Sequence, residues 1–265
     1  MIKKRELVSF DDICPFNCKH CYTFELDRTG HNRTINEIVD SLAGKEFDVV
    51  YVSQRKDNFV NPDEGLELCE KLYDRYNCNL IAITRNTFDN AQLDRLTKLN
   101  KRMRVNNKFL FMAVSIPALE SAKVTEDLQK IPTPQERMEF LEKISERGVL
   151  NILLIRPLFP DALVPVEEVL RIIQTCKKFV SCIVSSGLAV NEHILKRLNL
   201  KEDELVYSDE KIDYLVGAIE GNVKYIDVKN KIEIINDECK KWNIPFFEHS
   251  VPALNYLIRV TNNRG

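Results

Sequence analysis

Short apolar runs alternate with longer amphipathic segments along most of the chain. The apolar runs are rich in β-branched and aromatic residues, which predicts strands at residues 6–10, 48–53, 79–84, 108–115, 149–155 and 180–184. Between them, apolar residues recur at helical spacing, for example at Ile35, Ile38, Val39 and Leu42. The pattern therefore predicts strands and helices in regular alternation.

Capping residues mark where several of these helices begin or end. Thr34 and Glu37 match a capping box, and Asn61 followed by Pro62 is typical of a helix start. Gly148 suits the position just after a helix end, where a left-handed backbone is common. These boundaries agree with the apolar pattern.

Strands that are apolar on both faces and alternate with helices indicate a parallel sheet buried on both sides. The strand–helix units end near residue 190, which is too short for the eight-unit barrel of about 250 residues. We therefore predict an α/β fold, a partial (βα)6 TIM-like barrel over residues 1–190, with functional groups at the carboxyl ends of its strands. Residues 191–265 are expected to form a mixed C-terminal extension packed on the same domain, with helices near 191–198, 209–216 and 232–242.

Composition narrows the class of protein. The 265 residues include 38 basic and 40 acidic side chains, a formal charge of −2, and 44% are hydrophobic, which argues against disorder and against a general polyanion binder. The basic run 98–104 has no interleaved aromatics, so we interpret it as a solvated loop after a helix at 91–99. The N-terminus lacks a signal-peptide pattern and the apolar runs are too short to span a bilayer, so we expect a cytoplasmic protein with reduced thiols and no membrane contact.

Three of the eight cysteines form a C-x3-C-x2-C motif directly after the first strand: Cys14, Cys18 and Cys21. Such spacing lets one loop surround a metal centre, and thiolates suit zinc or iron–sulfur clusters. A structural zinc site needs four ligands and no second C-x2-C pair exists, although His20 offers a Cys3His alternative. The other cysteines are expected in the core: Cys69, Cys78, Cys176, Cys182 and Cys239.

In this motif, its position and the aromatic Tyr22 that follows it, the chain resembles the radical S-adenosylmethionine (SAM) enzymes. The resemblance implies that the three cysteines hold a [4Fe-4S] cluster whose remaining iron binds SAM. Reduction by a flavodoxin or ferredoxin-type donor would cleave SAM and give a 5′-deoxyadenosyl radical that abstracts hydrogen from substrate. The protein would bind, orient and shield these groups.

The resemblance also suggests which residues contact SAM. Family members often follow the second strand with a Gly-Gly-Glu segment, whereas residues 50–57 of this chain contain no glycine, so Ser53, Gln54 or Asp57 would replace it. The motifs Ala82-Ile-Thr84-Arg85-Asn86, Ala113-Val-Ser115-Ile-Pro117 and Thr133-Pro-Gln-Glu-Arg137 are similar to the spore photoproduct lyase-related subgroup. That similarity places Arg85 and Ser115 at the ribose or carboxylate of SAM. His20 and Tyr22, on either side of Cys21, are expected beside the cofactor.

Arginines follow three of the predicted strands: Arg55, Arg85 and Arg156. Strand ends converge on the mouth of a barrel, so these residues could bind an anionic group of SAM or substrate, unless one or two of them face solvent.

We therefore expect a radical SAM enzyme acting on a small-molecule or nucleotide-like substrate; no residue stands out as the one that acts on that substrate. A nucleic-acid-modifying or repair lyase of the same class is an alternative, disfavoured by the acidic charge and by the lack of a cysteine in residues 54–61, where spore photoproduct lyase has a hydrogen-donating one. A non-catalytic zinc or iron–sulfur regulatory module is the alternative outside enzymes.

Overall fold

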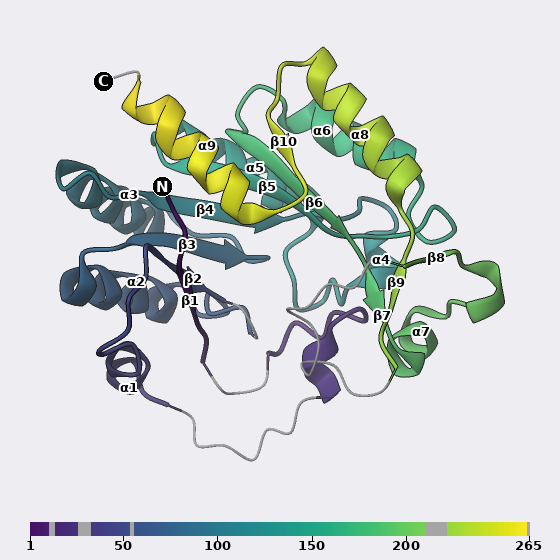
Figure 1. Cartoon of the computed structure of the whole chain (residues 1–265), viewed down its shortest axis with the longest axis horizontal. Coiled ribbons are helices and arrows are strands. Elements are labelled where there is room, and N and C mark those ends of the chain that lie inside the picture. Colours follow the sequence, from purple (N-terminus) through teal and green to yellow (C-terminus); the bar gives the residue numbers. More distant parts are fainter. Residues whose placement is uncertain (11–13, 26–32, 54–55, 210–221, 264–265) are drawn as a thin grey trace.

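A parallel sheet of seven strands organises the protein (Figure 1). The computed structural model describes residues 1–10, 14–25, 33–53, 56–209 and 222–263. Within them the strand order is β1-β2-β3-β4-β5-β6-β10, and every neighbouring pair is parallel. The strands are β1 (Arg5–Val8), β2 (Val49–Val52), β3 (Asn79–Thr84), β4 (Leu110–Ser115), β5 (Leu150–Leu158), β6 (Cys182–Gly187) and β10 (Phe246–Phe247).

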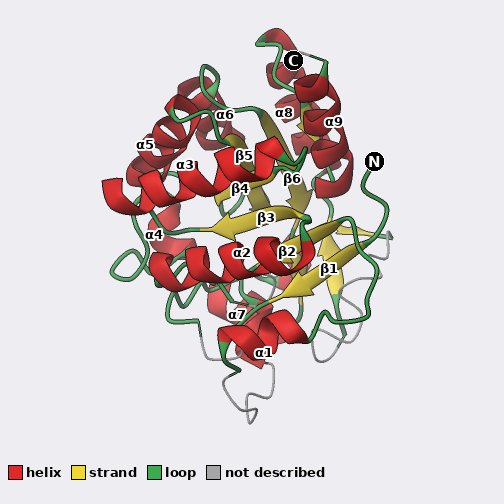
Figure 2. Ribbon diagram, turned by 90° about the vertical axis from the view of Figure 1, so that its left-hand side faces the viewer, coloured by secondary structure: helices red, strands yellow, loops and turns green. Residues whose placement is uncertain are grey.

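The helices that connect β1 to β6 cover one face of this sheet, as Figure 2 shows for α2 and α3. They are α1 (Ile35–Asp40), α2 (Pro62–Tyr76), α3 (Asn90–Val105), α4 (Ala122–Thr125), α5 (Pro134–Glu146) and α6 (Val166–Cys176). Successive strand side chains point to opposite faces, so Val50, Leu80 and Met112 pack toward these helices. This layer forms the main core.

The opposite face, which a closed barrel would enclose, is covered by the C-terminal helix α9 (Ser250–Asn262). Its apolar residues Ala253, Leu254 and Leu257 share a core with the inward-facing strand residues Tyr51, Ile81, Phe111 and Leu154. The hydroxyls of Tyr51 and Ser250 lie 2.9 Å apart. Both faces are therefore buried, as the apolar strands require.

The rest of the C-terminal extension lies beyond β6. It contains β7 (Ala189–Val190), α7 (Glu192–Leu198), the 3-10 helix η2 (Glu202–Glu204), β8 (Tyr207–Ser208), β9 (Lys224–Ile226) and α8 (Lys229–Lys241). Another 3-10 helix, η1 (Tyr22–Glu25), lies near the N-terminus, between β1 and α1. The strands β7, β9 and β8 form a small antiparallel sheet. The predicted fold class is confirmed, with no pairing that closes the large sheet among the described strands. The boundary at residue 190 stays a prediction, and the predicted helix 209–216 falls almost wholly outside the described residues.

Local sequence patterns predicted several helix boundaries correctly. Thr34 and Asn61 cap α1 and α2 through their side chains, and Gly148 has a φ of +67° just after α5. The predicted core cysteines are all buried and free: Cys69, Cys78, Cys176, Cys182 and Cys239. Among the described helices, none combines the length and the apolar character needed to cross a bilayer.

The interpretation of residues 98–104 as a loop is wrong. Helix α3 continues to Val105 because Leu99 and Met103 extend its buried stripe, which starts at Leu93. The guanidinium of Arg102 lies 5.3 Å above the Tyr73 ring, so this basic residue is used in packing between helices. Two helices were also not predicted, the short α4 and α9.

Gly65 in α2 allows the loop after β2 to pack closely. A Cβ atom there would lie 2.4 Å from Cδ1 of Phe59 and 2.8 Å from the carbonyl oxygen of Asn58. Phe59 is fully buried, so its ring has no room to move aside. The glycine therefore positions the segment that begins at Asp57.

We expect Gly65→Ala to lower the free energy of unfolding by about 1–3 kcal/mol in chemical denaturation, because overpacking outweighs the better helix propensity of alanine. Glu67→Ala, at a half-exposed position of the same helix where the carboxylate pairs with Lys71, should change it by less than about 1 kcal/mol. An unchanged or increased stability of Gly65→Ala would show that the loop is not held by this contact.

Candidate functional site

The three cysteines of the motif lie on the loop between β1 and η1. Cys18 is buried beside Phe16 and Ile131, and Cys14 and Cys21 are half-buried at the same small cluster. The backbone N–H of Cys21 donates to the carbonyl of Cys18 at 2.9 Å, which folds the C-x2-C segment into a turn. Asn17 supports the loop with a left-handed φ of +54°, a conformation that asparagine tolerates better than most residues.

The surroundings of these thiols are apolar on one side and cationic on the other. Burial raises the pKa of Cys14, and it raises the pKa of Cys18 to about 12 although the charge of Arg85 opposes the shift. Three soft sulfur donors that influence one another's ionisation suit an iron–sulfur cluster, since metal binding stabilises thiolates. Among the described residues, no three cysteine, histidine or carboxylate side chains converge on one point that would hold a single metal ion.

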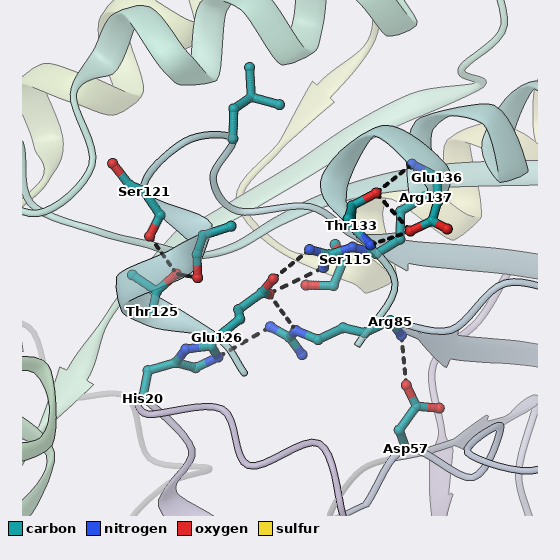
Figure 3. A network of polar contacts seen from close by, with 12 residues as sticks. His20, Asp57, Arg85, Ser115, Ser121, Thr125, Glu126, Thr133, Glu136 and Arg137 are labelled. Carbon is teal, nitrogen blue, oxygen red and sulfur yellow. Dashed lines mark hydrogen bonds and ion pairs between the residues drawn. The ribbon is translucent and has the colours of Figure 1, made fainter. Parts of the chain in front are cut away.

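Arg85, directly after β3, connects this loop to the ends of two other strands (Figure 3). Its Nε donates to Oε1 of Glu126 at 3.1 Å, and its Nη2 donates to the carbonyl of Arg156 at 3.2 Å. The same Nη2 lies 3.2 Å from Nε2 of His20. Burial opposes the charge of Arg85, but Cys18 and Glu126 outweigh it and hold the pKa above its ordinary value. Arg85 is therefore a fixed cation whose charge acts on the thiols of Cys18 and Cys21.

Glu126 is itself held by a second arginine. Arg137 of α5 has no exposed side-chain surface; its Nη2 pairs with Oε2 of Glu126, and its Nη1 donates to Oε1 at 3.2 Å. Nη1 also donates to the carbonyl of Ser115 at 2.6 Å. Burial alone would raise the pKa of Glu126, yet the two arginines lower it, so the carboxyl is ionised. One carboxylate thus joins two cations in a buried network.

Asp57 provides a second carboxylate at the carboxyl ends of β2 and β3. Its Oδ2 accepts the backbone N–H of Arg85 at 2.6 Å and the hydroxyl of Thr84 at 2.9 Å, and Oδ1 accepts the N–H of Phe59 at 2.9 Å. Burial raises the pKa of Asp57 despite these hydrogen bonds. All of this carboxylate's contacts within the described residues fix loop geometry.

Ser53 follows β2 with a φ of +93°, a region that residues other than glycine rarely adopt. Its hydroxyl accepts the N–H of Asn58 at 2.9 Å, and Oδ1 of Asn58 accepts the N–H of Phe10 at 3.0 Å. The chain therefore keeps a glycine-like backbone after β2 without a glycine, and uses the serine hydroxyl to tie this loop together. The neighbouring Gln54 lies outside the described residues.

His20 packs edge-on against Phe159, with ring centroids 5.3 Å apart. Burial, reinforced by the charge of Arg85, lowers the pKa of His20 to about 3, so the ring is neutral at neutral pH. With a guanidinium at Nε2, binding of a second cation by that nitrogen is disfavoured. This geometry weighs against the Cys3His zinc alternative through Nε2.

The structure brings some of the other predicted site residues close to Arg85. Ser115 ends β4, and its hydroxyl donates to the carbonyl of Arg156 at 3.0 Å, which also accepts from Arg85. Tyr22 begins η1 and packs half-buried against the main core. Arg55 lies outside the described residues, so the proposed group of three arginines stays a prediction.

Sequence reasoning missed Glu126 and gave Arg137 no role. Arg137 lies at helical spacing from the buried Leu141 and Ile144, and a charge on an apolar helix face is a signal that it has a buried partner. Glu126 follows the short helix α4 in a stretch without clear periodicity, so no pattern marks it.

We expect Arg137→Gln to lower the free energy of unfolding by about 3 kcal/mol, because the buried Glu126 carboxylate then loses one of its two cationic partners. Arg171→Gln removes the same charge from an exposed pair with Glu120 and should cost less than about 1 kcal/mol. Chemical denaturation of both variants checks this; equal losses would contradict a special role of the buried pair.

No protein-family model matches the chain. No curated protein matches it either.

Solved structures resemble this fold closely in shape and weakly in sequence. A spore photoproduct lyase mutant with bound AdoMet and dinucleoside spore photoproduct superposes with a TM-score of 0.62 at 12% identity, covering 92% of this chain and 75% of that one. SuiB of Streptococcus suis bound to S-adenosylmethionine gives 0.59 at 12% identity, covering 92% and 50%. AnSMEcpe with bound AdoMet gives 0.50 at 13% identity, covering 69% and 51%. The chain therefore has the fold of these radical SAM enzymes.

Proposed function

We propose that this protein is a radical SAM enzyme that cleaves S-adenosylmethionine reductively at a [4Fe-4S] cluster. The observation that carries the proposal is the C-x3-C-x2-C loop directly after β1, in a fold shared with spore photoproduct lyase and SuiB. The same loop lies at the carboxyl ends of the strands, where parallel α/β sheets place their active sites.

Cys14, Cys18 and Cys21 would hold the cluster as thiolates. When bound, the cluster supplies the electron that splits SAM into methionine and a 5′-deoxyadenosyl radical. Arg85 contributes a positive charge that acts on Cys18, and Glu126 helps to fix the orientation of its guanidinium. Since a cation stabilises thiolate, this placement favours the ligand form of the cysteines.

SAM would lie between the cysteine loop and the strand ends. We assign it to His20, Tyr22, Ser53, Gln54, Arg85 and Ser115. For Ser53, the support is its strained backbone directly after β2, because such conformations at residues other than glycine cluster at active sites and ligand-binding loops. For Arg85 and Ser115, the support is their shared contact with the Arg156 carbonyl at adjoining strand ends.

The substrate we propose is a small or nucleotide-like molecule with an anionic group, which Arg156 and Arg55 would bind. A nucleic-acid lyase is the second candidate, favoured by the likeness to a spore photoproduct lyase structure that contains a dinucleoside lesion. The net charge of −2 favours the first candidate over the second. A reduced flavodoxin or ferredoxin would supply the electron, in the cytoplasm.

After anaerobic reconstitution, we expect Cys18→Ala to retain little of the iron and acid-labile sulfide that the wild-type protein binds. The reduced wild-type cluster should give an electron paramagnetic resonance signal that changes when SAM is added. Cys69→Ala removes another buried thiol, within α2 and outside the motif, and should keep both the cluster and the SAM response.

A zinc-containing, iron-free wild-type protein would contradict the proposal and support the regulatory-module alternative. An intact cluster in Cys18→Ala would contradict the assignment of the ligands.

A further inference from the structure

The C-terminal extension is hydrogen-bonded to the cysteine loop through Arg197 of α7. Nε of Arg197 donates to the carbonyl oxygen of Lys19 at 2.9 Å, and Nη2 donates to the carbonyl oxygen of Cys21 at 2.8 Å. The two acceptors are separated from the arginine by 178 and 176 residues of sequence. A single guanidinium thus spans the turn that carries the second and third cysteines of the motif.

The turn is held from its other side as well. The N–H of Lys19 donates to the carbonyl of Thr125 at 3.1 Å, and the N–H of Cys21 donates to the carbonyl of Cys18 at 2.9 Å. The backbone N–H and carbonyl groups of Lys19 and Cys21 are therefore all hydrogen-bonded, with partners at Thr125 of α4, at Arg197 of α7 and at Cys18. Thr125 directly precedes Glu126, so the buried arginine network and Arg197 hold the same turn.

A second cation of the extension holds the neighbouring loop after β5. Nζ of Lys231, on α8, is buried, donates to the carbonyls of Phe159 and Val164, and lies 2.9 Å from the Asp161 carboxylate. The Phe159 ring packs against His20 within the C-x2-C turn. Lys231 thus holds the loop whose Phe159 ring contacts the cysteine turn, whereas Arg197 contacts the turn directly.

We propose that Arg197 is a positioning residue that fixes the Cys18–Cys21 turn in the geometry needed for the cluster and adds a positive charge beside it. This inference rests on the proposed function. Charged hydrogen bonds to carbonyls are stronger than neutral ones, and groups that orient metal ligands commonly change metal affinity by about 10–100-fold when removed. A nearby cation also favours the reduced, more negative cluster, which raises its reduction potential.

The test compares Arg197→Gln with Lys196→Gln in the reconstituted full chain. Both remove one positive charge from α7, but Lys196 is exposed and lies at the neighbouring position. We expect Arg197→Gln to release iron to a chelator roughly tenfold faster and to have a lower cluster midpoint potential. Lys196→Gln should match the wild type in both, and Arg197→Lys should restore the potential by restoring the charge.

Equal release rates in Arg197→Gln and Lys196→Gln would overturn the inference. Faster release with an unchanged potential would overturn it too, because a purely structural tie explains that result.

A cluster-free readout separates this failure from that of the proposed function. In apo protein, trypsin should cleave after the exposed Lys19 faster in Arg197→Gln than in Lys196→Gln, and equal rates would overturn the tie between α7 and the turn. A wild-type protein that binds no cluster would instead contradict the proposed function.

Discussion

A single buried carboxylate, Glu126, holds together the region where the candidate site is formed. It pairs with Arg85 after β3 and with Arg137 of α5, so it provides the negative charge that these two cations would otherwise lack. Its partner Arg85 interacts electrostatically with the thiols of Cys18 and Cys21. Its partner Arg137 donates a hydrogen bond to the carbonyl of Ser115 at the end of β4. Glu126, together with the carbonyl of Arg156, therefore holds the positive charge of Arg85 in place beside the cysteine loop.

The parallel sheet makes such a network possible because it brings the carboxyl ends of its strands together. In the loop after β2, the Asp57 carboxylate accepts a hydrogen bond from the backbone N–H of Arg85. In β5, the carbonyl of Arg156 accepts one from the Arg85 guanidinium. Much of the site is thus held by main-chain groups, whose positions follow from strand register. On the other side of the cysteine turn, the C-terminal extension adds Arg197, so the turn is held by α4 and by α7.

The sheet, most helices and the cysteine motif could be predicted because each leaves a local, periodic or spaced signal. Thr34, Asn61 and Gly148 show this for helix boundaries, and the cysteine motif shows it for the site. The partners Glu126 and Arg197 could not be predicted, because their contacts join segments far apart in sequence and depend on tertiary packing. Ser53 is intermediate: its position after β2 was predictable, whereas its positive φ at a residue other than glycine was not. The extent of α3 was underestimated because its last two turns are rich in basic residues, although Met103 continues the buried stripe.

The formation of 5′-deoxyadenosine by the anaerobically reconstituted protein, after addition of dithionite and S-adenosylmethionine, measures the proposed chemistry most directly. We predict 5′-deoxyadenosine and methionine in equal amounts from the wild-type protein and neither from a variant lacking Cys14, Cys18 and Cys21. A protein with a confirmed [4Fe-4S] cluster that forms no 5′-deoxyadenosine under these conditions would contradict the proposal.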